Sequence, residues 1–110
     1  MKSRGPAKRV TVFVGETDRY DGRALYAAVV AMLHTEGIAG ATVTRGVLGY
    51  GRSGRTHSAH ILDISEDLPV QIVFVDAAEA VDRVLARLDE MVGSGIATIE
   101  DVEEVVFGQD

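Results

Sequence analysis

Two kinds of apolar pattern follow one another along this chain, and their order constrains the fold more than any other feature. Runs rich in β-branched and aromatic residues suit a pleated sheet and predict strands. Segments whose apolar residues recur three and four positions apart predict amphipathic helices. The predicted elements, in chain order, are a strand at 10–14, a helix at 22–36, strands at 41–48 and 70–75, a helix from 76, and a strand at 96–107. This order predicts an α+β fold of the ferredoxin-like βαββαβ type, an antiparallel sheet with two helices on one face.

Several residues mark where these elements should begin and end. Gly37 and Gly93 supply the backbone freedom with which helices often end. Asp76 is followed three residues later by Glu79, which is the spacing of a reciprocal cap at a helix N-terminus. We expect the acidic pair at 100–101 to interrupt the last strand.

The length of 110 residues predicts one domain. Residues 1–7 include Gly5 and Pro6 and show no apolar period, so we expect them to form a flexible N-terminal tail. The single domain is then expected at residues 8–107.

A sheet with helices on one face leaves its other face bare. Thr11 and Phe13 alternate with the valines of the first strand and would lie on that face. Monomers rarely expose large contiguous apolar patches, so the sequence predicts a homo-oligomer.

Charge and composition exclude several classes of function. Lys and Arg number 11 against 17 Asp and Glu, a net charge of -6, which opposes nucleic-acid binding. The chain has no Cys, which rules out disulfides and zinc-thiolate sites and fits a reducing compartment, so we expect a cytoplasmic protein. The longest apolar run, 27–33, is far shorter than the roughly 20 residues of a membrane helix, so we expect no direct membrane insertion.

The segment Gly49-Tyr50-Gly51-Arg52-Ser53-Gly54 matches the G-x-G-x-x-G pattern. A dinucleotide site would need a helix directly after it, and the residues that follow show no helical period. Two interpretations remain open. The glycines can act as the hinge of a mobile loop, or their backbone N–H groups can bind a phosphate or carboxylate together with Arg45, Arg52 and Arg55.

His57 and His60, with Asp63 beyond them, are the candidate metal ligands. Their spacing would supply part of a zinc or nickel site if the segment folded into successive turns. The alternative is a pair of solvated loop histidines. A serine nucleophile needs a general base beside its hydroxyl and a carboxylate that orients the base. The sequence places no such pair around any of the nearby serines, so we expect no enzyme activity.

Three separated blocks carry a resemblance to a known family. They are Tyr20-x-Gly22-x-x-Leu25-Tyr26, residues 40–46, and Ser65-Glu66-Asp67-Leu68-Pro69. In this order they resemble the uncharacterised PII-like branch called domain of unknown function 190. Residues 37–44, 49–52 and 68–76 resemble the corresponding stretches of PII signalling proteins.

The resemblance implies a fold, an assembly and a site. PII-like proteins are ferredoxin-like homotrimers, many of which bind adenine nucleotides between subunits while a flexible loop contacts a transporter, a channel or an enzyme. The positions that match the PII nucleotide cleft are Thr42, Gly49, Tyr50, Gly51 and Arg52.

The C-terminal part departs from the PII pattern. The Gly-Asp-Gly-Lys phosphate loop is absent, and no Lys or Arg follows Arg87. Phosphate charges need cations once they leave water. Only Arg45, Arg52, Arg55 and the two loop histidines would supply them, so we expect fewer phosphates than in PII, or a cyclic nucleotide or bicarbonate instead.

Together these features predict a non-enzymatic regulator. It would be a homotrimer without a required cofactor that binds a small anionic ligand, an adenine nucleotide being the candidate, and controls a partner such as a membrane transporter or channel through residues 52–69. Two alternatives remain: a metal-binding trimer that uses His57 and His60, and a ligand-free scaffold for protein interactions.

Overall fold

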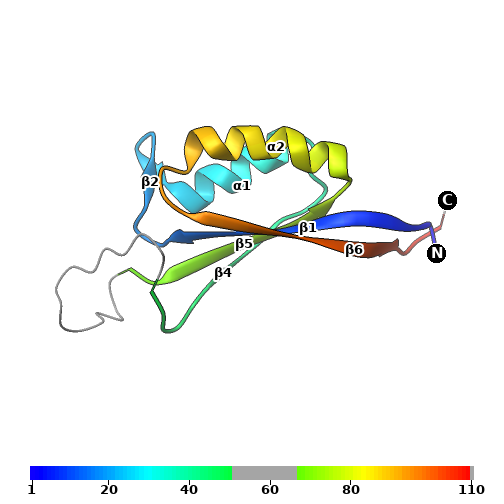
Figure 1. Ribbon diagram of the computed structural model, residues 1–110, viewed down its shortest axis with the longest axis horizontal. Helices are drawn as coiled ribbons and strands as arrows, with labels where there is room; N and C mark the ends of the chain where they lie inside the picture. Colours follow the sequence, from blue (N-terminus) through cyan, green and yellow to red (C-terminus); the bar gives the residue numbers. More distant parts are fainter. Residues whose placement is uncertain (51–66, 110) are drawn as a thin grey trace.

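The computed structural model describes residues 1–50 and 67–109. It shows an antiparallel sheet with two helices packed on one face (Figure 1). The elements are β1 (Ser3–Gly15), β2 (Arg19–Tyr20), β3 (Arg23–Ala24), α1 (Leu25–Thr35), β4 (Thr42–Arg45), β5 (Pro69–Asp76), α2 (Ala78–Met91) and β6 (Ile96–Val106). The predicted ferredoxin-like α+β fold is confirmed, with the short hairpin of β2 and β3 added between the first strand and the first helix.

The sheet has the strand order β4-β5-β1-β6, and each neighbouring pair is antiparallel. The alternating valines of β1 and the alternating residues of β5 face the helices, because cross-strand partners such as Val10 and Phe74 share a face. The two central strands therefore supply the floor of the core.

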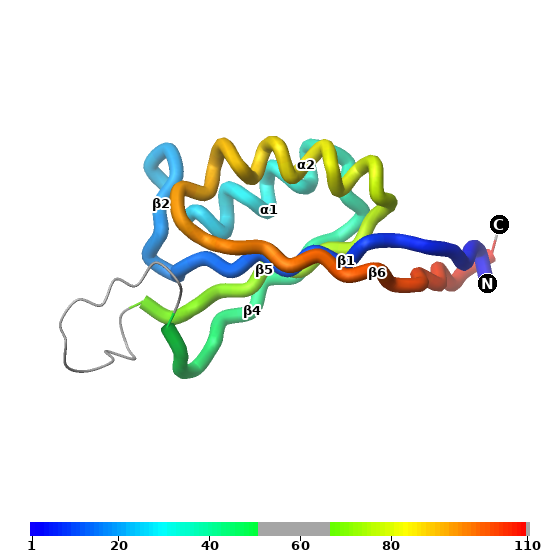
Figure 2. Tube along the Cα trace, viewed as in Figure 1, coloured from blue at the N-terminus to red at the C-terminus, as the bar shows by residue number. Residues whose placement is uncertain are grey.

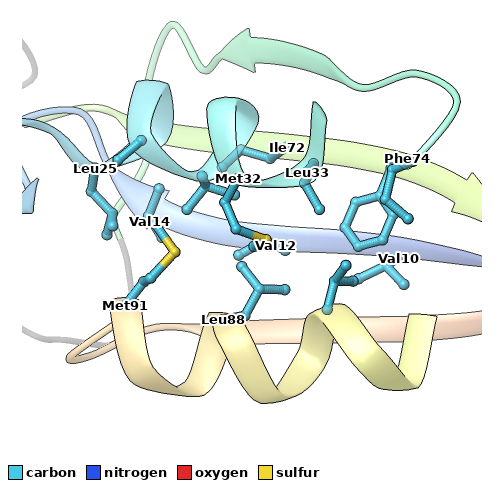
Figure 3. Packing of buried hydrophobic residues seen from close by; sticks show 14 of the residues in the cluster. Val10, Val12, Val14, Leu25, Met32, Leu33, Ile72, Phe74, Leu88 and Met91 are labelled. Carbon is cyan, nitrogen blue, oxygen red and sulfur yellow. The ribbon is translucent and has the colours of Figure 1, made fainter. Parts of the chain in front are cut away.

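The core lies between this floor and the two helices (Figure 3). Leu33 of α1 and Leu88 of α2 reach down to Val12 and Phe74, and all four side chains are at most 5% exposed. Full burial of an aliphatic or aromatic side chain contributes about 1.5–3 kcal/mol, so this layer is a main source of stability.

No helix of the described residues is long and apolar enough to cross a membrane.

The opposite face of the sheet is uncovered in the described chain, as the sequence predicts (Figure 1). Thr11 and Phe13 of β1 and Val73 and Val75 of β5 are only half-buried there. Ile96 of β6, opposite Phe13, is 39% exposed. A stripe of apolar side chains thus crosses three strands without a second layer.

The predicted flexible tail is wrong, because β1 begins at Ser3. Residues 3–7 pair with Val106 through Val102 of β6, and the Lys2 amide donates to the Val106 carbonyl at 2.7 Å. The predicted interruption at residues 100–101 is also wrong, since β6 runs unbroken through them. Arg9 forms an ion pair with Glu100, and Lys8 with Asp101, so the acids are compensated across the strands.

These extended parts of β1 and β6 form a two-stranded ribbon, residues 3–8 and 101–106, that projects beyond the helices (Figure 2). The molecule measures 55 × 26 × 20 Å as a result. The first described residues, 1–2, and the last, 107–109, lie at the tip of this ribbon (Figure 1).

Both helices begin later than the sequence predicts. α1 starts at Leu25 because residues 19–24 form the β2–β3 hairpin, whose turn places Asp21 at φ 50° and Gly22 at φ 85°. α2 starts at Ala78, and Asp76 remains in β5. The Asp76 carboxylate accepts from the amides of Ala77 (2.8 Å) and Ala39 (3.3 Å), so the predicted reciprocal cap with Glu79 does not form.

Candidate functional site

A cleft of about 170 Å³ opens at the end of the sheet that is distant from the ribbon. It lies where β1 ends and where β5 and β6 begin. Its lining residues are Phe13, Val14, Gly15, Asp18, Tyr50, Asp67, Pro69, Ser94, Gly95 and Ile96. The cleft joins the half-buried apolar face, through Phe13 and Ile96, to a group of polar loop residues.

Close packing of two glycines against Pro69 brings the glycine segment to this cleft. A Cβ at Gly46 would lie 3.1 Å from Pro69 Cγ, and one at Gly49 would lie 3.0 Å from the same atom. The Gly46 amide also donates to the Pro69 carbonyl at 2.8 Å. The chain after β4 is thereby held against the start of β5, and Tyr50 reaches the cleft with 81% of its surface exposed.

Two carboxylates form the polar wall of the cleft. The Gly15 amide donates to Asp18 Oδ2 at 2.8 Å, and the Thr17 amide donates to Asp67 Oδ1 at 3.1 Å. A Cβ at Gly15 would lie only 2.7 Å from Asp67 Oδ1 and 3.2 Å from Asp18 Oδ1. Glycine at the end of β1 therefore leaves the space that both carboxylates occupy. Their remaining lone pairs can accept hydrogen bonds from hydroxyl or amino groups.

Arg45, at the end of β4, is engaged close to this wall. Its Nη1 lies 2.7 Å from Glu16 Oε2. The hydrogen bond and the charge of Glu16 raise the pKa of Arg45 above its usual value. The guanidinium charge is thus compensated by a carboxylate of the same chain.

The structure brings part of the predicted ligand site together. Gly49 and Tyr50 meet at Pro69, whereas Thr42 lies at the start of β4, paired with Val73. Val73 is four residues along β5 from Pro69, about 13 Å at roughly 3.3 Å per residue. Thr42 shares the uncovered face of the sheet with Val73 and does not line the cleft.

The other predicted ligands lie outside the described residues. They are Gly51, Arg52 and Arg55 of the anion site and the candidate metal ligands His57 and His60. Within residues 1–50 and 67–109, His, Cys, Asp and Glu form no group of three or more that could hold a metal ion.

Sequence reasoning missed Gly15, Asp18 and Asp67. The available signal was a glycine directly after a β-branched run with an aspartate three residues later, a common turn pattern. The contribution of Asp67 depends on the pairing of β1 with β5, which local pattern does not reveal.

Family comparison covers nearly the whole chain. The model of the DUF190 family, described as "Uncharacterized ACR, COG1993", matches residues 7–104. The chain belongs to the DUF190 family. Among its relatives, a UPF0166 protein of Methanocaldococcus jannaschii is 38% identical over 96 residues, which cover 86% of this chain and 88% of the relative. A UPF0166 protein of Aquifex aeolicus is 29% identical over 100 residues, covering 89% and 92%.

Solved structures share the DUF190 chain's fold. A protein of Thermus thermophilus named as a PII-like signaling protein aligns with a TM-score of 0.66 at 23% identity, covering 96% of this chain and 94% of that one. CPII of Thiomonas intermedia, a nitrogen regulatory PII-like protein, aligns with a TM-score of 0.63 at 19% identity in a structure with ADP and bicarbonate, covering 94% and 93%. Another CPII structure, with ADP, AMP and acetate, gives 0.62 at 17% identity, with the same coverage. The DUF190 family to which the sequence points is confirmed, and the chain shares the fold of these PII-like proteins.

Proposed function

We propose that this DUF190 protein is a non-enzymatic, PII-like regulator. As a homotrimer it binds a small anionic ligand, an adenine nucleotide being the candidate, in clefts between subunits, and it controls a partner protein through residues 52–69. The observation that carries the proposal is the packing of Gly46 and Gly49 on Pro69, which holds Tyr50 at the rim of the cleft. The ADP and AMP bound to the fold relative CPII support the choice of ligand class.

The cleft chemistry favours the nucleoside part of such a ligand. The exposed Tyr50 ring offers a face on which an adenine base can stack, an interaction worth about 1–3 kcal/mol per base in single-stranded nucleic-acid complexes. Asp18 and Asp67 are hydrogen-bond acceptors suited to ribose hydroxyls or an exocyclic amino group. Carboxylates act in this way on the ribose of dinucleotides in other folds.

The same charges limit the number of phosphates. Asp18 and Asp67 repel a phosphate placed between them, and Arg45 is already paired with Glu16. Phosphates therefore depend on Arg52 and Arg55, or on Arg45 after exchange of its carboxylate for the ligand. We expect the mono- or diphosphate to bind more tightly than ATP.

The trimer accounts for two features of the subunit. It covers the apolar stripe that includes Phe13 and Val73, because buried apolar surface stabilises an association. It also allows Thr42 of one subunit to approach the Tyr50 cleft of another, although the two residues are far apart within one chain.

The test measures ligand binding by the full-length oligomer. Calorimetric titration and thermal shift with AMP, ADP, ATP, cyclic AMP and bicarbonate are compared for the wild type, for Arg52→Ala and for the matched control Arg87→Ala. Arg87 lies on α2, pairs with Glu36 and does not line the cleft. A ligand that binds only the native state raises its melting temperature by mass action.

We expect one or more adenine nucleotides to bind the wild type and the control equally. Arg52→Ala should weaken that binding at least tenfold while the trimer persists. Unchanged binding in Arg52→Ala would remove this residue from the site. A panel without any shift would reject these anionic ligands and leave two alternatives, the metal-binding trimer and the ligand-free interaction scaffold.

A further inference from the structure

The ribbon of residues 3–8 and 101–106 has two unlike faces. Arg4 pairs with Glu103 at 2.9 Å, and Lys8 pairs with Asp101, on the face that continues the helix-covered side of the sheet. The other face carries small and apolar residues: Ser3, Gly5, Ala7, Val102 and Val106, interrupted only by Glu104. That face continues the uncovered side of the sheet.

Phe107 follows this ribbon directly and is 81% exposed. A two-stranded ribbon without a further layer is marginally stable in water. The exposed ring of Phe107 adds apolar surface at the tip of the ribbon. Burial of this surface against another protein surface would stabilise the ribbon.

A separate apolar groove lies at the other end of the molecule. It runs between the C-terminal half of α2 and the start of β6 and has a volume of about 200 Å³. Its lining residues are Val12, Leu85, Leu88, Asp89, Val92, Gly95, Ile96 and Ala97. Ile99, on the same side of β6 as Ala97, is 47% exposed and continues the apolar surface along the outer edge of the strand.

The groove matches an aromatic ring in size and chemistry. A cavity of about 150 Å³ lined by aliphatic and aromatic side chains accepts benzene in an engineered protein. The walls from Leu85, Leu88 and Val92 are of the same kind, with Asp89 as the one charged residue.

Phe107 cannot occupy the groove of its own chain. Ala97 in the groove and Phe107 at the ribbon tip are ten residues apart along an extended strand, roughly 33 Å at about 3.3 Å per residue. The start of β6, which lines the groove, and the end of β6, which Phe107 follows, lie toward opposite ends of the long axis (Figure 2). If the aromatic ring of Phe107 fills this groove, the Phe107 must belong to another copy of the chain.

We infer that the ribbon of one copy docks head-to-tail on a second copy, with Phe107 in the groove between α2 and β6. A contact between two different surfaces of the same chain is heterologous, and it closes into a ring when the rotation between copies allows. This inference rests on the homotrimer of the proposed function and names the contact that closes it. Phe107 becomes the anchor, and the charged face of the ribbon with Arg4 and Lys8 stays in solvent.

A single tryptophan tests the contact, because the chain contains none. In Phe107→Trp the indole should emit at shorter wavelength than free tryptophan, and dilution that dissociates the oligomer should shift the emission to the red. The second variant, Phe107→Trp with Leu85→Glu, places a carboxylate in the groove and should give red-shifted emission at every concentration. Light scattering on the same samples reports the oligomeric state.

Cross-linking provides an independent readout, since native cysteines are absent. Phe107→Cys with Ala97→Cys, treated with a short bismaleimide, should give covalent dimers and trimers. Phe107→Cys with Glu90→Cys is the control, because Glu90 is exposed on α2 outside the groove, and it should remain largely monomeric on a denaturing gel.

The outcomes separate this inference from the proposed function. If the protein is a trimer but the indole of Phe107→Trp emits as in water, the docking of Phe107 is overturned, while the trimer and its ligand site stand. The same conclusion follows if the trimeric double variant Phe107→Cys with Ala97→Cys does not cross-link. A monomeric wild type overturns both the docking and the proposed function.

Discussion

Among single residues, Gly15 matters most to the shape of the cleft, because a glycine has no side chain to occupy the space there. Gly15 ends β1 where the carboxylates of Asp18 and Asp67 both approach its Cα. Any larger residue must displace one of them. The loop after β1 and the segment just before β5 can therefore pack closely together only because residue 15 is a glycine.

Replacement of Gly15 by alanine should therefore destabilise the protein by about 1 kcal/mol, because the Asp67 carboxylate must move and loses its hydrogen bond from Thr17. The measurement is the urea midpoint. Gly93→Ala is the matched control, since its Cβ would meet no atom within 4 Å, and it should be neutral or slightly stabilising. Equal midpoints for both variants would contradict the close approach at Gly15.

A second residue-level prediction concerns alkaline pH. The hydrogen bond to Asp101 and the charge of that residue raise the pKa of Lys8 above its usual value of 10.5. A raised folded-state pKa means that the pair stabilises the protein fully below pH 10.5 and that this contribution is lost as the pH rises through the folded-state pKa. Lys8→Met should be less stable than the wild type at pH 9, with a difference that shrinks above pH 10.5. The effect is small because the pair is exposed, and urea midpoints at both pH values measure it. A difference that grows with pH would have the wrong sign.

At the scale of elements, local pattern predicts the two helices and four main strands but not their ends. The core positions follow from periodicity, as Leu33 and Val84 illustrate. The hairpin of β2 and β3 and the full length of β1 depend on partners: residues 3–7 are strand because β6 lies beside them, which no pattern within those residues indicates. The cleft wall was missed for the same reason, because it combines side chains from the loop after β1 and the segment just before β5.

In the molecule as a whole, the two helices cover one face of the sheet, and no second layer of the described chain covers the other. The helices bury their apolar stripes against the sheet, while the face with Phe13 and Val73 stays half-exposed. The docking groove and the ribbon tip lie at opposite ends of the same elongated body. In the proposed trimer, a closed ring of subunits uses all three surfaces.

A charge on the uncovered face of the sheet should therefore separate the subunits of the proposed trimer without unfolding them. Phe13→Glu should convert the proposed trimer to monomers in light scattering while the far-ultraviolet circular dichroism stays native, because Phe13 points away from the core between the helices and the sheet. Ala86→Glu, on the exposed side of α2, is the control and should remain trimeric. A trimeric Phe13→Glu would show that the face is not an interface between copies.

The pairing of the first strand with the last has a consequence for how the chain acquires its shape. β1 is a central strand, and one of its two neighbours, β6, follows all the other described elements along the chain. Closing the sheet therefore requires a contact across almost the full length of the chain, which costs loop entropy and slows folding. During synthesis, the edge of β1 that faces β6 stays unpaired until β6 has left the ribosome, so the sheet cannot close before residues 96–106 are available.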